Sequence, residues 1–432
     1  MDKIKIKGGR LLNGEIFISG AKNAALPLIC ASLLTEETVT LTNMPILSDI
    51  KSMNLLLEQL GTQIDSFDDF VDGHPTKTYS YRTPELTSIA APYDYVRKMR
   101  ASYYVLGPLL ARAGKVELSL PGGCAIGTRP MDIHLAAMEE MGAKIDIRNG
   151  YVYGEVDGRL KGAHIVFRTV SVGATCNVLM AATLAEGITV LENAAKEPEI
   201  GDLINLLNDM GAKISGIGTS ILTIEGVKKL HGARHKVIPD RIEAGSYAVA
   251  AAITGGKIEL INAQTYTLKT PMQILQKMGV EVMPTERGIL VDATGKKLIG
   301  EDIITEPFPG FPTDLQAQFM ALLTVAEGAG MVTETIFENR FMHVPELLRM
   351  GANINVHGHA SAIVRGVKKL SGAPVMATDL RASFALVLAG LAAEGETVVN
   401  RVYHLDRGYE KLEEKLKGVG ADNERVKEDG EE

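Results

Sequence analysis

Apolar and polar positions follow one order along this chain, and that order occurs six times. Each copy begins with an Ala-rich apolar stretch of helical length, such as 174–185, followed by a Glu-Gly turn and a β-branched strand such as 188–191. A second helix, as in 199–210, places Ile and Leu at helical spacing among charged residues, and a strand pair completes the copy. The pattern therefore predicts six copies of one helix–strand unit.

A glycine ends the second helix of every copy. The glycines are separated by 81, 69, 68, 72 and 69 positions, by subtraction of their numbers, and are Gly61, Gly142, Gly211, Gly279, Gly351 and Gly420. Glycine at this position is typical of a left-handed helix C-cap. The Ala-rich helices carry little polar surface and are predicted to be buried, whereas the charged second helices are predicted to face water. Sheets outside a helical core are the expected result.

Two segments depart from the repeat. Residues 66–88 add a polar stretch to the first copy, and we interpret them as a hairpin followed by a loop. The charged end, 423–432, has no apolar periodicity and is predicted to fray.

Composition limits the class of protein. A chain of 432 residues is long for one core, so two domains are expected. The net charge of −8 argues against a general nucleic-acid binder, and no apolar run approaches the ~20 residues of a membrane helix. Three cysteines, Cys30, Cys124 and Cys176, form no disulfide framework and lack metal-ligand spacing. With no apolar signal region after Met1, we expect a cytoplasmic protein without nucleic-acid or membrane partners.

Polar residues precede each Ala-rich helix, where free backbone amides and the helix dipole favour anions. Capping explains the Asn, Ser and Asp residues at these positions. Capping does not explain Lys22, Arg100 and Arg381, because a cation at a helix N-terminus is electrostatically unfavourable. We interpret them as contacts of a shared anionic ligand. Two domains of three copies would then form a cleft that has cations on both walls and closes on a polyanion.

The loop 121–130 combines three glycines with Cys124 and Arg129. Glycine lets backbone amides approach a ligand closely, and a guanidinium suits phosphate or carboxylate and can activate a nearby thiol. Taken alone, the stretch fits equally well a Gly-Pro turn that contains a small apolar cysteine.

Five motifs together resemble one family. They are residues 20–27, 121–130, 311–314, 338–343 and 377–383. In this order they are similar to the UDP-N-acetylglucosamine 1-carboxyvinyltransferase family of enolpyruvyl transferases, over nearly the whole chain. The resemblance implies a two-domain inside-out α/β barrel, with three repeats in 22–237 and three in 1–21 with 238–432. It also implies that the active site lies in the cleft between the domains.

The resemblance implies a reaction as well. The 3′-hydroxyl of UDP-N-acetylglucosamine adds to C2 of phosphoenolpyruvate and phosphate is eliminated, which commits the sugar nucleotide to peptidoglycan. No metal or redox cofactor is implied. His134, His343 and His404 are scattered without metal-ligand spacing, which favours structural or substrate contacts.

The resemblance assigns catalytic roles to Cys124, Asp314, Lys22 and Arg407. Cys124 matches a cysteine associated with C3 of phosphoenolpyruvate, and Asp314 matches the proposed base for the sugar hydroxyl. Substrate binding is assigned to Lys22, Asn23, Arg100, Arg129, Pro130, His134, Ser171, Val172, Gly173, Asp314, Ile336, Phe337, Arg340, Asp379, Arg381 and Arg407. Asp240 and Glu243 match a pair near the point where the chain crosses between domains. Thr169 departs from the family, many members of which carry a basic residue there, and Arg168 is the alternative cation.

The sequence argues against three other functions. The sister enzyme that makes 5-enolpyruvylshikimate 3-phosphate shares the fold, but Cys124 argues against it. A non-catalytic paralogue that binds the sugar nucleotide is disfavoured by the intact Cys124, Asp314 and Lys22. An RNA-end cyclase is opposed by the net charge and by the lack of an evident catalytic histidine motif.

Overall fold

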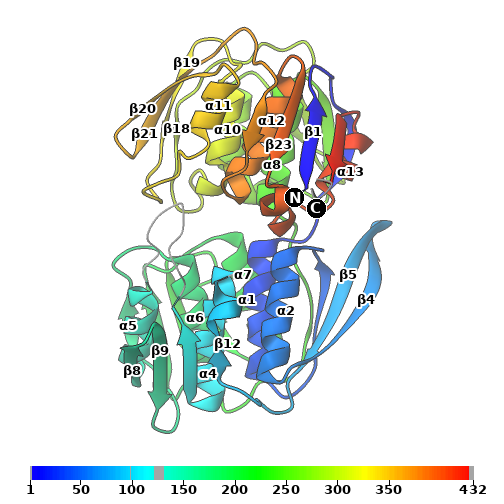
Figure 1. Ribbon diagram of the computed structural model, residues 1–432. Coiled ribbons are helices and arrows are strands. Elements are labelled where there is room, and N and C mark those ends of the chain that lie inside the picture. The colour runs from blue at the N-terminus through cyan, green and yellow to red at the C-terminus, as the bar shows by residue number, and fades with distance from the viewer. Residues whose placement is uncertain (1, 98, 121–130, 428–432) are drawn as a thin grey trace, which may run out of the picture. The chain divides into compact units, whose positions relative to one another are not determined.

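The computed structural model describes residues 2–97, 99–120 and 131–427. Within these residues the chain divides into two compact units. The first unit contains residues 20–120 and 131–238, and the second contains residues 2–19 and 239–427. Figure 1 labels the elements of both units.

The first unit alternates helices with short strands. Its helices are α1 (Lys22–Ala31), η1 (Ser32–Leu34), α2 (Ser48–Leu60), α3 (Tyr93–Val96), η2 (Arg100–Val105), α4 (Leu106–Ala113), α5 (Asp132–Glu140), α6 (Val172–Thr183) and α7 (Pro198–Asp209). Its strands are β3 (Val39–Met44), β4 (Gln63–Val71), β5 (His74–Arg82), β6 (Ala90–Ala91), β7 (Lys115–Ser119), β8 (Ala143–Arg148), β9 (Tyr151–Val156), β10 (His164–Val166), β11 (Ile188–Glu192), β12 (Lys213–Ser215), β13 (Ile221–Glu225) and β14 (Arg234–Lys236).

The second unit repeats this order. Its helices are α8 (Arg241–Thr254), η3 (Thr265–Thr267), α9 (Lys269–Lys277), η4 (Thr313–Leu315), α10 (Gln316–Leu323), α11 (Val344–Arg349), α12 (Leu380–Ala392), η5 (Val402–Arg407) and α13 (Leu412–Gly418). Its strands are β1 (Lys3–Lys7), β2 (Asn13–Phe17), β15 (Lys257–Ile261), β16 (Glu281–Pro284), β17 (Gly288–Asp292), β18 (Ile303–Ile304), β19 (Ala329–Thr333), β20 (Asn353–His357), β21 (Ser361–Arg365), β22 (Pro374–Met376), β23 (Glu396–Asn400) and β24 (Asp422–Val426).

Six four-stranded sheets of one design correspond to the six predicted copies. The first unit has β14-β3-β5-β4, β6-β7-β9-β8 and β10-β11-β13-β12, and the second has β22-β23-β1-β24, β18-β19-β21-β20 and β16-β17-β15-β2. Every sheet has one parallel pair at an edge, such as β10 with β11, and antiparallel pairs elsewhere. The repeat predicted from the hydrophobic pattern is therefore confirmed.

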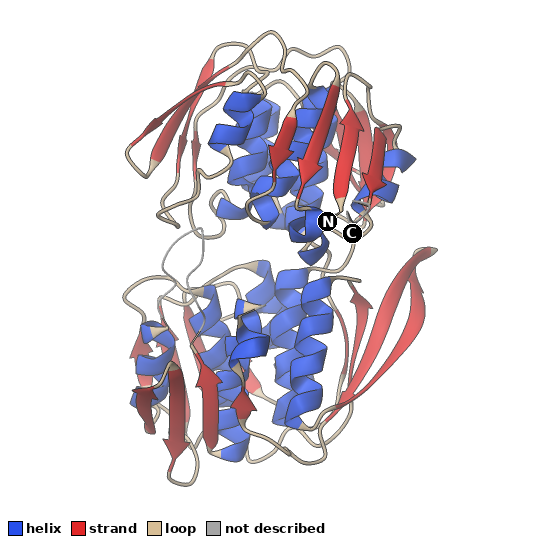
Figure 2. Ribbon diagram, viewed as in Figure 1, coloured by secondary structure: helices blue, strands red, loops and turns tan. Residues whose placement is uncertain are grey.

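The Ala-rich helices are buried, as predicted. Every residue of α6 from Gly173 to Thr183 is buried, and so is every residue of α12 from Arg381 to Leu391. A helix that is apolar all round must be enclosed, and the small alanine side chain lets neighbouring helices pack closely. In each unit the helices gather in the middle and the strands lie outside them (Figure 2).

Glycine ends the second helix of each copy in the predicted left-handed conformation. The φ angles of the six glycines lie between 91° at Gly351 and 108° at Gly61. A side chain with a Cβ is strained at such angles, so the spacing of glycine in the sequence marks the repeat reliably.

Two local predictions were wrong. The second helices do not simply face water, because α2 buries Asp49 and α7 buries Asp202. Each carboxylate has a cationic or histidine partner that offsets the cost of burial. The charged end is not frayed over 422–426, where β24 pairs with β1. Arg425 also binds Asp406 and Glu413, so ion pairs and backbone hydrogen bonds replace apolar burial there.

Candidate active site

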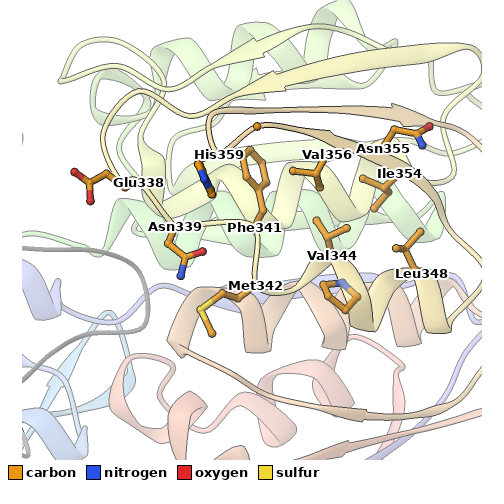
Figure 3. Close-up of a pocket in the computed structure, with 12 residues that line it drawn as sticks. Glu338, Asn339, Phe341, Met342, Val344, Leu348, Ile354, Asn355, Val356 and His359 are labelled. Atoms are coloured by element: carbon orange, nitrogen blue, oxygen red, sulfur yellow. The ribbon is translucent and has the colours of Figure 1, made fainter.

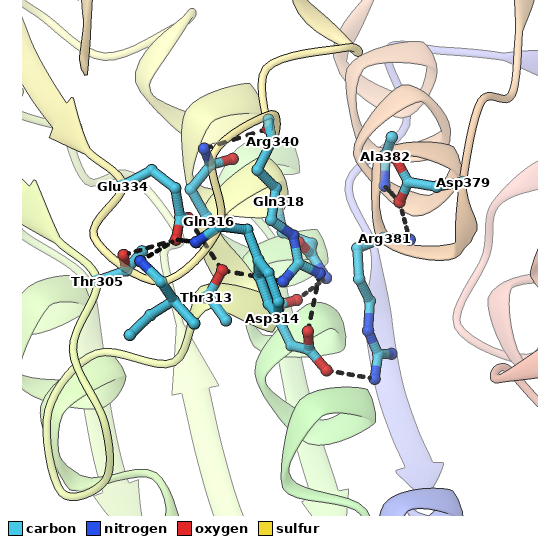
Figure 4. A network of polar contacts seen from close by, with 12 residues as sticks. Thr305, Thr313, Asp314, Gln316, Gln318, Glu334, Arg340, Asp379, Arg381 and Ala382 are labelled. Atoms are coloured by element: carbon cyan, nitrogen blue, oxygen red, sulfur yellow. Dashed lines mark hydrogen bonds and ion pairs between the residues drawn. The ribbon is translucent and has the colours of Figure 1, made fainter. Parts of the chain in front are cut away.

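Asp314 lies between two guanidinium groups in the second unit (Figure 4). Arg340 Nη2 donates to Asp314 Oδ1 at 2.8 Å, and Arg381 Nη2 donates to Oδ2 at 3.0 Å. The arginine side chains are 6% and 5% exposed, whereas the Asp314 side chain is 26% exposed. The carboxylate can therefore be reached from solvent while both cations are buried.

Three segments that are distant in the sequence supply this cluster. Asp314 lies in η4, Arg340 lies in the loop after β19, and Arg381 is the second residue of α12. Burial lowers the pKa of Arg381, but Asp314, Tyr409 and Asp240 together outweigh burial, and the pKa ends above its usual value. Two guanidinium groups against one carboxylate leave a net positive charge. The cluster can therefore attract an anion.

Glu334 ties this cluster to the loop that carries Ile336 and Phe337. The side chain of Glu334 is buried; Oε1 accepts hydrogen bonds from the backbone amides of Ile336 and Phe337 at 2.9 and 3.1 Å and from Thr305 Oγ1 at 3.0 Å. Oε2 accepts from Thr313 Oγ1 at 2.9 Å. Figure 4 shows Glu334 beside Thr305 and Thr313. Glu334 therefore fixes the loop and the residue next to Asp314 at once.

The predicted loop residues lie close to Arg340. Ile336 is exposed and Phe337 is half-buried, and the guanidinium of Arg340 is 5.1 Å from the Phe337 ring centroid. Arg340 Nη1 also donates to Thr313 Oγ1 at 2.9 Å. The structure thus joins Arg340 and Arg381 directly to Asp314, and joins Phe337 to the same cluster through Arg340.

Asp379 and Asp240 act as helix caps. Asp379 Oδ1 accepts from the backbone amides of Arg381 and Ala382 at 2.9 and 3.1 Å, and Asp240 caps α8 in the same way. Capping satisfies amides that have no partner inside the helix. The described contacts of Asp379 thus orient α12, and with it Arg381.

In the first unit Lys22 begins α1 and pairs with Asp49. Lys22 Nζ lies 3.1 Å from Asp49 Oδ2, and the two side chains are 9% and 6% exposed. A cation at this helix start thus has a carboxylate partner within the protein. Asn23 follows it in α1 and is half-buried.

His134 lies beneath the start of α6. Asn177 Nδ2 donates to His134 Nδ1 at 3.0 Å, and because Asn177 Oδ1 accepts from the Gly107 amide, Nδ1 must be the acceptor. The His134 ring packs edge-on against the Tyr103 ring, with the two ring centroids 4.9 Å apart. Burial lowers the pKa of His134 to about 4, so the ring is neutral at neutral pH. The described contacts of His134 support α6, whose N-cap is Ser171 and whose first residues are Val172 and Gly173.

Gly173 packs directly on this support, so Gly173→Ala is expected to destabilise the protein. An added Cβ would lie 2.7 Å from Tyr103 Oη and 3.0 Å from His134 Cε1. Such overpacking is expected to lower the free energy of unfolding by about 2 kcal/mol. Gly201→Ala in α7 is the matched control, because its nearest neighbour is 3.7 Å away, and alanine there should stabilise the helix. Urea unfolding of both variants tests this, and equal stabilities would contradict it.

Several of the predicted site residues lie outside the part of the chain that the structure describes. Cys124, Arg129 and Pro130 lie outside the described residues, and so does the side chain of Arg100, the residue that begins η2. Arg407 is the last residue of η5 and is half-buried.

Among the described residues, no group of three or more His, Cys, Asp or Glu could hold a metal ion. In the same part of the chain, no helix combines the length and apolar character needed to cross a membrane.

Similar proteins match along the whole chain. A family model described as EPSP synthase (3-phosphoshikimate 1-carboxyvinyltransferase) matches residues 6–416. A protein of Paramagnetospirillum magneticum named UDP-N-acetylglucosamine 1-carboxyvinyltransferase is 60% identical over 428 residues, which is 99% of both chains. One of the same name from Granulibacter bethesdensis is 61% identical over 99% of this chain and 100% of its own. This chain belongs to the UDP-N-acetylglucosamine 1-carboxyvinyltransferase family.

Solved structures agree on the fold. The enolpyruvyl transferase NikO of Streptomyces tendae superposes with a TM-score of 0.86 at 24% identity, covering 98% of this chain and 99% of its own. An EPSP synthase of Acinetobacter baumannii gives a TM-score of 0.75 at 18% identity, and the match covers 99% of this chain and 100% of that one. The predicted fold class, an inside-out α/β architecture shared with enolpyruvyl transferases, is confirmed.

Thr169 stands where the resemblance leads us to expect a basic residue, and its neighbour Arg168 is already engaged. Arg168 Nη2 contacts Asp132 Oδ2, and both side chains are exposed. The two residues line a cavity of about 210 Å³ together with Ile133 and Phe167. A ligand that used Arg168 in place of a basic residue at 169 would have to share it with Asp132.

Asp240 and Glu243, which the resemblance pairs, lie at the start of α8, where Glu243 forms a buried ion pair with Lys415. Lys415 Nζ donates to Glu243 Oε1 at 2.6 Å and to Ser19 Oγ at 2.8 Å, and the Ser19 amide donates to Glu243 Oε2 at 2.8 Å. This pair joins residue 19, at the end of the N-terminal segment of the second unit, to α8 and α13. Burial outweighs the attraction of Lys415 and raises the pKa of Glu243 from 4.5 to about 7.

The raised pKa of Glu243 predicts a pH-dependent stability. Between pH 4.5 and 7 the folded protein keeps a proton that the unfolded chain has lost, so the free energy of unfolding falls as pH rises through this window. Relative to Glu243→Gln, the wild type should lose about 2–3 kcal/mol between pH 5 and pH 8. Urea unfolding of both proteins at the two pH values measures this difference. Identical pH dependence in the two proteins would rule it out.

A cavity of about 410 Å³ lies next to the loop that carries Arg340 (Figure 3). Part of its lining comes from the same loop, with Glu338, Asn339, Phe341 and Met342, and the rest comes from α11 and the β20–β21 hairpin. None of the predicted site residues lines this cavity, and most of its labelled side chains are apolar. We assign it no part in the site.

Proposed function

We propose that this protein transfers the enolpyruvyl group of phosphoenolpyruvate to the 3′-hydroxyl of UDP-N-acetylglucosamine and releases inorganic phosphate. The observation that carries the proposal is the identity of about 60%, over 99% of the chain, to proteins named for this reaction. The product would be the sugar nucleotide committed to peptidoglycan synthesis. The EPSP synthase alternative is less well supported, since the solved EPSP synthase is only 18% identical.

In the proposed reaction, addition comes before elimination. The sugar oxygen forms a bond to C2 of phosphoenolpyruvate as a proton is added at C3. The C2–O bond to phosphate then breaks as a proton leaves C3, which restores the double bond. The centre carries several negative charges, and guanidinium groups held in place stabilise them without reorganising.

Asp314 suits the role of base for the sugar hydroxyl. Its carboxylate is partly exposed, so a substrate hydroxyl can reach it, and Arg340 and Arg381 each bind one of its oxygens. A base must lie within hydrogen-bond reach of the proton that it removes, and Arg340 and Arg381 restrict where the carboxylate can lie. The neighbouring Ile336 and Phe337 are proposed to contact the nucleotide part of the substrate.

The remaining roles follow the family. Lys22 and Arg407 are proposed to bind phosphoenolpyruvate, and Cys124 to act at its C3. Further substrate contacts are proposed for Asn23, Arg100, Arg129, Pro130, His134, Ser171, Val172, Gly173, Asp379 and Arg381. No metal or cofactor is part of the proposal.

Phosphate release tests the proposal. The protein is incubated with phosphoenolpyruvate and either UDP-N-acetylglucosamine or shikimate 3-phosphate, and inorganic phosphate is measured over time. Release with the sugar nucleotide alone would support the proposed function. Release only with shikimate 3-phosphate would favour the sister enzyme, and tight nucleotide binding without release would favour a non-catalytic paralogue.

A further inference from the structure

The phenol of Tyr409 is buried directly beneath Arg381. Tyr409 follows η5 and is 2% exposed. Its ring packs against Phe384 at 4.3 Å, and the Arg381 guanidinium is 5.6 Å from the ring centroid. Tyr409 is outside the set of residues that the family motifs singled out, and it is too deeply buried to be a surface contact.

Three polar groups contact the phenol oxygen. Arg381 Nη1 lies at 3.4 Å, Gln318 Nε2 at 3.1 Å and Ser246 Oγ at 3.0 Å. A guanidinium can only donate, and so can the amide nitrogen of Gln318, so the phenol oxygen accepts from both. Its own proton must then go to Ser246 Oγ, which in turn donates to the Ile242 carbonyl at 2.7 Å. Gln318 Nε2 also lies 3.1 Å from Ser246 Oγ, so its two protons are shared among Tyr409 Oη, Ser246 Oγ and the Asp314 carbonyl.

Both donors to Tyr409 also hold Asp314. Arg381 uses Nη1 for the phenol and Nη2 for Asp314 Oδ2, at 3.0 Å. Gln318 Nε2 also donates to the backbone carbonyl of Asp314 at 3.0 Å. Figure 4 shows Gln318 and Arg381 on either side of Asp314. One hydroxyl thus sets the position of two groups that fix the carboxylate and its backbone.

We infer that Tyr409 is a positioning residue for the reaction, in which its hydroxyl holds Arg381 and Gln318 so that Asp314 faces the substrate hydroxyl. The inference rests on the proposed function and adds a residue to it. Burial raises the pKa of Tyr409 above its usual value, so the phenol remains protonated and keeps donating to Ser246.

Loss of the hydroxyl has a defined consequence for Asp314. Without the phenol oxygen, Arg381 Nη1 loses its acceptor, and the guanidinium is free to turn and take both carboxylate oxygens in the bidentate manner that arginine favours. A carboxylate held in this way is a weaker acceptor for the sugar hydroxyl. The defect is therefore expected to fall on the chemical step more than on substrate binding, to which Arg381 is itself proposed to contribute.

Tyr409→Phe tests the inference, with Tyr247→Phe as the matched control. Tyr247 is also fully buried and packs edge-on against the same Phe384 at 5.5 Å, but its hydroxyl has no hydrogen-bond partner among the described residues. In the phosphate-release assay, Tyr409→Phe is expected to lower kcat about tenfold and to change both KM values by a smaller factor than kcat. Tyr247→Phe is expected to retain the wild-type kcat.

The outcomes separate this inference from the proposed function. Tyr409→Phe with wild-type kcat, or with raised KM and unchanged kcat, would overturn the inference while the proposed function stands. A wild type that releases no phosphate with UDP-N-acetylglucosamine would overturn both. If Tyr409→Phe does not fold, Ser246→Ala removes the acceptor of the phenol proton, and an unchanged kcat in that folded variant would overturn the inference.

Discussion

Replacing Asp314 by asparagine is expected to lower kcat for phosphate release about a thousandfold, the scale on which general bases contribute. Asparagine has nearly the same shape but cannot take a proton from the sugar hydroxyl. Its amide nitrogen would also face one of two guanidinium groups that now bind the carboxylate at 2.8 and 3.0 Å. The variant therefore loses both the proton acceptor and the charge that balances Arg340 and Arg381.

Stability must be followed in the same experiment. Two buried guanidinium groups without their carboxylate are expected to cost about 3 kcal/mol of unfolding free energy. The assay is therefore run well below the unfolding temperature, with circular dichroism as a check on folding. Asp302→Asn is the control, because its carboxylate oxygen only accepts the Met331 amide and an asparagine oxygen can do the same. A folded Asp314→Asn variant with kcat within tenfold of wild type would exclude Asp314 as the base.

Glu334→Ala is expected to lower the free energy of unfolding by about 3 kcal/mol, because buried donors left without acceptors are costly. Two backbone amides and two threonine hydroxyls would lose the carboxylate that now accepts from them. The loop of Ile336 and Phe337 would lose its anchor at the same time. KM for UDP-N-acetylglucosamine is expected to rise about tenfold, which corresponds to 1.4 kcal/mol of binding.

Two further variants show how much of the lost unfolding free energy is due to the buried hydrogen bonds of Glu334. Glu334→Gln keeps one oxygen for the backbone amides and should cost about 1 kcal/mol, the net contribution of one hydrogen bond. Glu327→Ala removes an exposed glutamate whose ion pair with Lys297 is solvated, and it should change stability by less than about 1 kcal/mol. Urea unfolding and substrate titration measure both quantities. A loss for Glu334→Ala no larger than for Glu327→Ala would show that the buried carboxylate does not organise the loop.

The repeat was readable from the sequence because it depends on local chemistry. Glycine is the residue that reaches φ near +100° without strain, so Gly61 and Gly351 mark helix ends wherever they occur. Alanine-rich helices such as α6 have no polar face and must be enclosed. Burial of Asp49 and Asp202 was not foreseen, since a charged residue in an amphipathic helix normally faces water and their partners are distant in sequence.

Part of the site was also readable. Asp314, Arg340 and Arg381 stand in motifs that the family resemblance singled out, and the structure brings all three into contact. Glu334 and Tyr409 carried no such signal, because a glutamate after a strand or a tyrosine after a short helix is ordinary in sequence. Only their buried hydrogen bonds to residues distant in the sequence distinguish them. Glu334 binds Thr313, which is 21 positions away, and Tyr409 binds Gln318, which is 91 positions away.

The sequence by itself determined the six-fold repeat, the buried helices and the family of this protein, because hydrophobic spacing, glycine caps and motifs are properties of neighbouring residues. The tertiary structure decided which charges meet. It paired Lys22 with Asp49, placed Asp314 between two guanidinium groups and placed the Tyr409 hydroxyl behind one of them. Electrostatic and hydrogen-bond energies depend on distances of about 3 Å between atoms that the chain separates widely, and sequence spacing does not encode those distances.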